Sequence, residues 1–160
     1  MTAPGLAEIG PFLDRHTTMT LATTGPADVW AAALFFARDE ALNLYFISSP
    51  ETRHARDIES NPAVAVTVNG DVRAWADIQG VQIAGTAARL SPDRRNAVEA
   101  LYFAHFPDIA RLLKAPAGDD ERKIATGFAA GQYYCVTPRT IRLIDNTRAF
   151  GFSAEFTLGD

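Results

Sequence analysis

The chain has 160 residues, of which 48% are hydrophobic and 21% charged, as in an ordinary globular protein. Its 15 basic and 19 acidic side chains leave a net charge of −4, which excludes the broad positive surface that binds duplex nucleic acid or anionic membranes. Because Cys135 is the only cysteine, an intrachain disulfide and a cysteine-rich zinc site are also excluded, and we expect a single domain in a cytoplasmic protein.

The first half of the chain predicts a helix followed by a β-sheet. The helix is expected within residues 1–16, although Pro11 lies inside its hydrophobic pattern. Residues 17–90 then show strand patterns joined by short polar turns, which favour an antiparallel meander over a parallel doubly wound sheet. The expected strands cover residues 19–23, 29–36, 42–47, 63–68 and 78–90.

A second helix is expected to interrupt these strands. Ser49 is its predicted N-cap and Pro50 its first residue, because a hydroxyl before a helix and a proline at its first position both suit a helix start. In the last of the long strand segments, Gly80 and Gly85 indicate β-bulges or close approaches of the backbone.

The second half predicts a helical insertion and a return to the sheet. The pair Ser91–Pro92 opens the insertion, which is expected over residues 91–130 and contains a loop at 114–121. Strands return within residues 131–160, with a bend at Pro138. These strands are expected at 133–136, 140–144 and 149–152. About six β segments with three helices indicate a small α+β barrel.

The segment from Ser48 to Arg56 has the clearest chemical pattern. A helix start offers unpaired backbone N–H groups and the positive end of the helix dipole, and here hydroxyl and basic side chains lie within one turn of it. This combination suits a phosphate monoester. The alternative is that Ser49 only caps the helix, while Arg53 and Arg56 form a solvated face, with Arg53 paired to Asp57.

Patterns for several other kinds of site are missing. The sequence has no glycine-rich phosphate loop, no nucleophile elbow and no paired metal-binding histidines, so we assign neither a metal site nor a catalytic side chain. His105 and Cys135 are interpreted as packing residues, with axial haem ligation by His105 as an alternative. Trp30 and Trp75, each followed by alanine, suit either a core or a flat shelf for a planar ring.

Several runs follow one another in the order and spacing of a known family. They are residues 18–23, 30–36, 44–49, 52–56, 61–66 and 80–87, with a further run at 137–151. Together they resemble the pyridoxamine 5'-phosphate oxidase-like, FMN-binding split-barrel superfamily. The last run is similar to the ending of a small, poorly characterised branch of it.

This resemblance implies a fold, an assembly and a cofactor site. The fold would be mainly β with helices (α+β), a six-stranded antiparallel split β-barrel with a helical insertion, and two copies would form a homodimer with FMN sites at the interface. Thr52, Arg53 and His54 match the stretch that grips the FMN phosphate. The residues implied around them are Ile47, Ser48 and Ser49 at the preceding strand end, Ala32, Ala33 and Leu34 beside the isoalloxazine ring, and Gln82 facing that ring.

The chain also departs from the oxidases of this superfamily. They carry a basic residue where this chain has Ala32 and Ala33, a lysine where it has His54, and a glutamine where Gly80 falls. Because histidine is mostly neutral near pH 7, attraction for phosphate should be weaker than with lysine. No match was found to the C-terminal tryptophan and arginine set that binds pyridoxal phosphate, so vitamin oxidation is not expected.

The leading hypothesis is therefore a homodimeric FMN-dependent oxidoreductase acting on a small-molecule substrate or electron donor that the sequence does not identify. The flavin would carry the hydride, and the protein would orient it and exclude water. Two alternatives remain open. One is a non-catalytic flavin-binding or sensing module, and the other is a related barrel that uses deazaflavin or haem.

Overall fold

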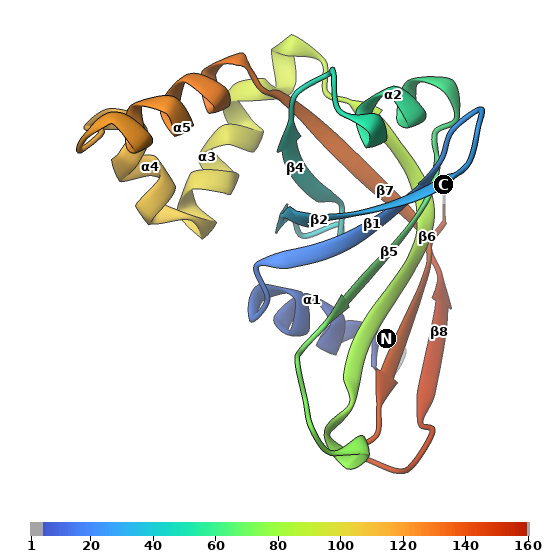
Figure 1. The fold of residues 1–160 in the computed structure, drawn as a ribbon. Coiled ribbons are helices and arrows are strands. Elements are labelled where there is room, and N and C mark those ends of the chain that lie inside the picture. The colour runs from blue at the N-terminus through green and yellow to red at the C-terminus, as the bar shows by residue number, and fades with distance from the viewer. Residues whose placement is uncertain (1–4, 160) are drawn as a thin grey trace.

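The computed structural model describes residues 5–159, and its centre is an eight-stranded antiparallel sheet that curls into a half-barrel (Figure 1). Seven strands follow one another in the order β2-β1-β5-β6-β7-β4-β3, and β8 pairs with β7. The strands are β1 (Thr18–Thr24), β2 (Val29–Phe35), β3 (Ala37–Arg38), β4 (Leu44–Ser48), β5 (Ala63–Asn69), β6 (Gln79–Arg89), β7 (Gln132–Asp145) and β8 (Ser153–Thr157). The antiparallel α+β architecture expected from the sequence is confirmed.

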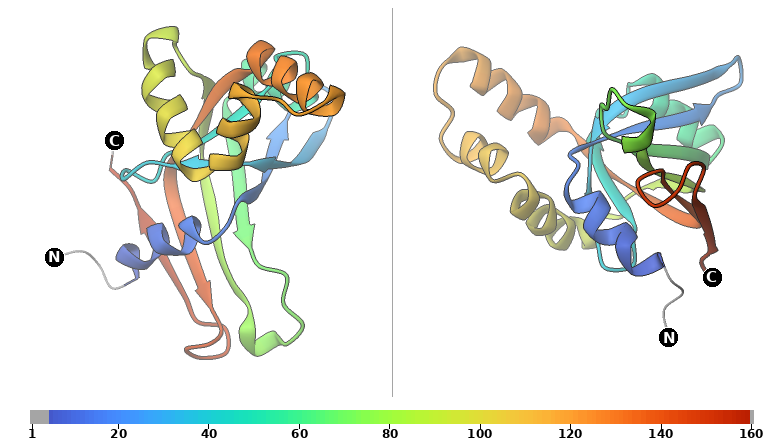
Figure 2. Two further views of the ribbon diagram at one scale, coloured as in Figure 1. Left: turned by 90° about the vertical axis from the view of Figure 1, so that its left-hand side faces the viewer. Right: turned by 90° about the horizontal axis from the view of Figure 1, so that it is seen from below.

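In the described part of the chain, five α-helices accompany the sheet, and they lie in three places (Figures 1 and 2). The first packs inside the curl, the second lies across one end of the sheet, and the last three form an arm to one side. They are α1 (Leu6–Asp14), α2 (Arg53–Ser60), α3 (Arg95–His105), α4 (Pro107–Lys114) and α5 (Asp119–Ala130), with 3₁₀ turns η1 (Trp75–Asp77) and η2 (Pro92–Arg94). Within residues 5–159, no helix is both long enough and apolar enough to span a bilayer.

The alternation of side chains along the strands separates two faces of the sheet. The inner face carries the buried residues Leu21, Val66, Ile83 and Ile141, and α1 covers this face with its own apolar stripe. The outer face carries their exposed sequence neighbours. Helix α1 continues through Pro11, so the expected N-terminal helix is present and unbroken.

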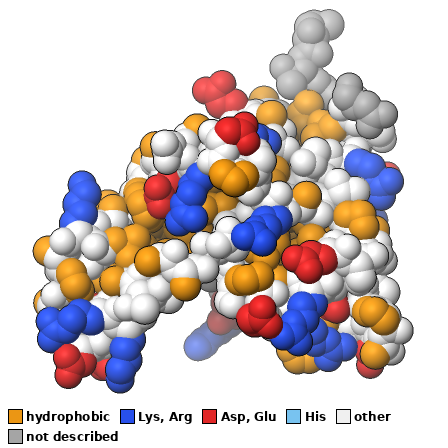
Figure 3. Space-filling view, turned by 90° about the horizontal axis from the view of Figure 1, so that it is seen from above, with side chains coloured by type: hydrophobic (Ala, Val, Ile, Leu, Met, Phe, Trp, Pro, Cys, Tyr) orange, Lys and Arg blue, Asp and Glu red, His pale blue; other side chains and the backbone are white. Residues whose placement is uncertain are grey.

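A second apolar cluster holds the helical arm against the sheet. Val98 and Tyr102 of α3 pack on Tyr45 of β4 and Tyr133 of β7. These helix residues lie on one face of α3, because their spacing of four places them one above the other. Seen from above, the arm projects to the left, and hydrophobic side chains are visible where it meets the rest of the molecule (Figure 3).

The start of α2 differs from the prediction. The helix begins at Arg53, with Thr52 as N-cap, so Ser49 is not the cap and Pro50 is not the first helical residue. The reason is a turn that precedes the helix, in which the backbone N–H of Thr52 donates to the Ser49 carbonyl at 3.2 Å. A serine followed by proline suits such a turn as well as a helix start.

The C-terminal half corrects two further boundaries. The last strand is β8 rather than residues 149–152, because that segment closes a turn in which the N–H of Phe152 donates to the Ala149 carbonyl at 3.0 Å. The expected loop at 114–121 is shorter, since α5 begins at Asp119 with three acidic residues at its positive end.

Strand β7 runs without a break through Pro138, where two strands were expected. The β6–β7 register pairs Ala84 with Thr140 but Gly85 with Pro138, so Arg139 is an extra residue that bulges from the ladder. The bulge accommodates a proline that cannot donate a ladder hydrogen bond. The bulge also brings the β7 backbone close to β6, so that a Cβ on Gly85 would lie 2.2 Å from the Thr137 carbonyl oxygen.

We therefore predict that Gly85→Ala destabilises the protein by about 1–3 kcal/mol, the usual cost of overpacking where the backbone must move. Urea denaturation would show a lower midpoint with an unchanged slope. Gly127→Ala in α5 is the matched control, because no atom lies within 4 Å of its added Cβ. It should leave stability equal or raise it by about 1 kcal/mol. Equal midpoints for Gly85→Ala and the wild type would contradict this role of the bulge.

Candidate functional site

The candidate site is the split where two strands of the half-barrel separate. The chain passes from β2 through Phe36 into β3, which pairs with β4 at Ala37 and Tyr45. Beyond this pair the ladder stops, and the facing edges of β2 and the end of β4 have no strand between them. Such edges keep backbone N–H and C=O groups free for a ligand.

A pocket of about 410 Å³ lies in this split, within the size range of small-molecule sites. Helices α3 and α5 close one side of it. The lining residues are Ala33, Leu34, Phe35, Ile47, Ser48, Ser49, Tyr102, Ile124, Gly127, Phe128 and Gly131. None of these side chains carries a charge at neutral pH, and the two serines stand where β4 ends. The pocket is therefore apolar with a hydroxyl-bearing end.

That polar end leads to the start of α2, which lacks the groups that usually satisfy a helix N-terminus. Its N-cap makes no side-chain capping bond, because the Thr52 hydroxyl donates instead to the Ser49 carbonyl at 2.9 Å. No acidic residue lies in the first turn. The first backbone N–H groups and the helix dipole are thus available to an anion. The Ser49 hydroxyl accepts from the N–H of Glu51, which leaves its own proton free to donate.

The two arginines of α2 have different surroundings. The guanidinium of Arg56 pairs with Glu51 at 2.6 Å. Arg53 has no carboxylate partner among residues 5–159, and its guanidinium lies 4.5 Å above the centre of the Trp30 ring. The alternative pairing of Arg53 with Asp57 is absent, because Asp57 accepts a hydrogen bond from Thr23. Of the two, only Arg53 offers an uncompensated positive charge.

His54 lies in the second layer of the site rather than at its surface. It is 7% exposed, and its Nε2 lies 2.7 Å from the Ser48 hydroxyl and 3.2 Å from the Thr52 hydroxyl. Burial lowers the pKa of His54, and nearby Asp57 only partly opposes this. The imidazole is thus neutral at pH 7, and it braces the two hydroxyls of the turn instead of adding a cation.

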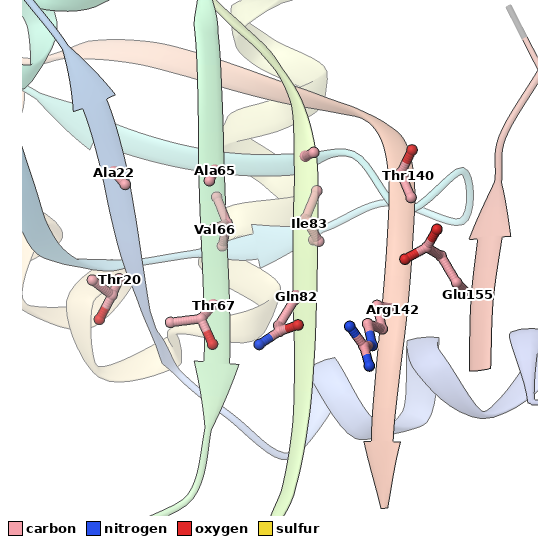
Figure 4. A pocket seen from close by; sticks show the side chains of 11 residues that line it. Thr20, Ala22, Ala65, Val66, Thr67, Gln82, Ile83, Thr140, Arg142 and Glu155 are labelled. Atoms are coloured by element: carbon pink, nitrogen blue, oxygen red, sulfur yellow. The ribbon is translucent and has the colours of Figure 1, made fainter. Parts of the chain in front are cut away.

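Gln82 stands apart from the other predicted site residues. It is exposed on the outer face of β6, where it lines a different hollow together with Thr20, Thr67 and Arg142 (Figure 4). The register places it in one row with Ala33, but three strands away. At the usual strand spacing that is roughly 14 Å. Within this chain, Gln82 does not reach the split.

The other predicted residues gather around the split. Five of them line the pocket, and Thr52, Arg53 and His54 adjoin its polar end, while Ala32 precedes Ala33 on β2. Sequence reasoning missed the wall supplied by the arm, namely Tyr102, Ile124 and Phe128. A signal for that wall existed, because Ile124 and Phe128 have the four-residue spacing of one helical face.

Comparisons with known proteins agree with this architecture. The UPF0306 protein of Klebsiella pneumoniae subsp. pneumoniae is 31% identical over 147 residues, which is 91% of this chain and 88% of that protein. A heme binding protein from Mycobacterium smegmatis superposes with a TM-score of 0.70 at 17% identity, covering 98% of this chain and 60% of the other. A FAD-binding protein from Mesorhizobium loti superposes with a TM-score of 0.64 at 15% identity, covering 86% of this chain and 91% of the other.

The identities of the two solved structures are low, so their likeness concerns the fold alone. They show that this kind of half-barrel occurs both in a haem-binding and in a flavin-binding protein. The family profile described as pyridoxamine 5'-phosphate oxidase matches residues 6–145, which include every strand except β8. The chain therefore belongs to the pyridoxamine 5'-phosphate oxidase family.

Proposed function

We propose that this protein binds FMN in the split between β2 and β4 and acts as an oxidoreductase on a small molecule. The observation that carries the proposal is the uncompensated charge of Arg53 at an uncapped helix start, directly beside an apolar pocket. This pairing of a positively charged end with an apolar pocket suits a ligand that has a phosphate at one end and a flat, largely apolar ring at the other.

The phosphate end has three kinds of donor close to the helix start. The first N–H groups of α2, the Ser49 hydroxyl and the Arg53 guanidinium all converge on the helix start. His54 adds no charge there, but it keeps Ser48 and Thr52 in place through its hydrogen bonds. Charge-assisted bonds from arginine to phosphate are the strongest of this set.

At the ring end, the apolar pocket and the unpaired backbone edge of β2 suit the flavin ring. The edge of β2 at Ala32 to Leu34 presents peptide groups that can pair with the polar edge of a flavin, while Ile47 and Phe128 bound the pocket with apolar surface. A bound flavin would supply hydride transfer, and the protein would hold the ring and exclude water. The open space above Gly127 leaves room for a second small molecule.

We further propose that two copies associate through the outer face of the sheet. Small side chains cover this face at Ala22, Ala65 and Ala84, so another surface can approach closely, and they line a hollow of about 390 Å³ (Figure 4). In a two-fold pair the same patch meets itself. Such a pair would bring Gln82 of the second copy toward the first copy's site, where it could face the flavin ring.

Haem is the second candidate ligand. The heme binding protein from Mycobacterium smegmatis shares this fold. In this chain, His105 at the end of α3 has a buried Nε2 without a hydrogen-bond partner in the described residues. Imidazole nitrogen is a usual axial ligand of haem iron.

The absorption spectrum separates these functions. We expect the purified protein to show a flavin spectrum, or to quench FMN fluorescence on titration to a one-to-one end point. A haem-type spectrum, or no change on titration with FMN, would reject the flavin proposal. Deazaflavin titrated in the same way tests the remaining alternative.

Arg53→Ala should weaken FMN binding about ten- to a hundredfold, because a hydrogen bond to a charged group contributes about 1.5–3 kcal/mol. Fluorescence titration measures the change. Arg56→Ala is the matched control, since Arg56 already pairs with Glu51 and should change affinity little. Equal losses in both variants would remove Arg53 from the phosphate site.

Ala65→Arg should convert the dimer into a monomer, because it places an unpaired charge at the centre of the proposed interface. Light scattering coupled to gel filtration reports the mass. Ala7→Arg, on the exposed side of α1, is the control and should remain dimeric. A wild-type protein that is monomeric at micromolar concentration would overturn the assembly proposal.

A further inference from the structure

Trp30 provides a platform under Arg53. It stands near the start of β2, opposite Thr23, and 44% of it is exposed. Its ring centre lies 4.5 Å below the Arg53 guanidinium, within the range of a cation–π interaction. Thr23 in turn binds Asp57 of α2 at 2.8 Å. The platform and the helix that carries the arginine are therefore fixed to the same strand pair.

Arg53 needs such a support because its position is otherwise unfavourable. It is the first residue of α2, where the positive end of the helix dipole repels a cation. It also has no carboxylate partner among residues 5–159, unlike Arg56 one turn later. A flexible side chain in this position would spend much of its time turned into solvent, away from the helix start. The Trp30 ring offsets that tendency.

We propose that Trp30 is a positioning residue for anion binding, acting through Arg53. The ring holds the guanidinium beside the N–H groups of α2 before the ligand arrives, so less side-chain freedom is lost when the anion binds. The inference rests on the proposed function in one respect, the identification of the anion with the phosphate of FMN. Trp30 acts on the anion only through Arg53 and does not itself contact the flavin ring.

The test compares FMN affinity in Trp30 variants by fluorescence titration. Trp30→Leu should weaken FMN binding about two- to fivefold, the effect expected for an exposed cation–π pair. Trp30→Phe, which keeps an aromatic face, should restore most of the affinity. Trp75→Leu is the matched control, because Trp75 is also exposed but packs on Phe150 at the far end of the sheet, and it should bind FMN like the wild type.

Two further arms distinguish positioning from direct contact. Riboflavin has the same ring without the phosphate, so its affinity should be equal in wild type and Trp30→Leu. In an Arg53→Ala background, Trp30→Leu should cause no additional loss, since the group it positions is gone. The inference would be overturned if Trp30→Leu bound riboflavin more weakly than the wild type. It would also be overturned if the double variant bound FMN more weakly than Arg53→Ala alone.

The outcomes also separate this inference from the proposed function. FMN binding by the wild type with unchanged affinity in Trp30→Leu rejects only the role of Trp30. If the wild type does not bind FMN, the proposed function fails, and titration with inorganic phosphate decides the inference. Phosphate binding that weakens in Trp30→Leu supports it, whereas equal binding in both proteins or none in the wild type rejects it.

Discussion

The hydrogen bond from the Thr23 hydroxyl to the buried carboxylate of Asp57 joins α2 to the β1–β2 hairpin, across 34 positions of sequence. A buried carboxylate is costly unless it is hydrogen-bonded, so this contact strongly favours one placement of the helix. Gly25 makes the contact possible, because a Cβ there would lie 2.1 Å from an Asp57 oxygen. With α2 fixed in this way, its first residue lies at the mouth of the split, and Arg53 meets Trp30.

The split itself results from how the sheet is built. Strand β2 runs on into the short β3, and only β3 pairs with β4, so no ladder joins β2 to β4 on the side toward α2. Helix α1 fills the inner face, and α3 seals the opposite side of β4 and β7. The two apolar clusters stabilise the sheet and its helices on either side of the split, and the pocket lies in the split itself.

Several elements were predictable from local patterns, and others were not. Strands β1, β2, β4, β5 and β6 follow from local strand patterns, whereas the two-residue β3 lies between two expected strands and was not predicted. The bulge at Gly85 follows from a glycine in a long strand. The start of α2 was misplaced because a serine and a proline suit a turn and a helix equally. The role of His54 was also beyond local reasoning, since its burial depends on contacts with β4. The family resemblance found the residues around the split, but not the wall that the helical arm adds.

The sequence by itself determined the class of the fold, the antiparallel pairing of its strands, and the position of a basic, hydroxyl-bearing segment at a helix start. These depend on periodicity, composition and neighbours in the chain, all of which are local. Tertiary structure decided which basic side chains of this segment keep an uncompensated charge that can bind an anion. Arg56 is neutralised by Glu51, His54 is buried and uncharged, and Arg53 alone rests on an aromatic ring near the pocket. Charge compensation and burial depend on which distant segments meet, and only the folded chain brings Trp30 beneath Arg53.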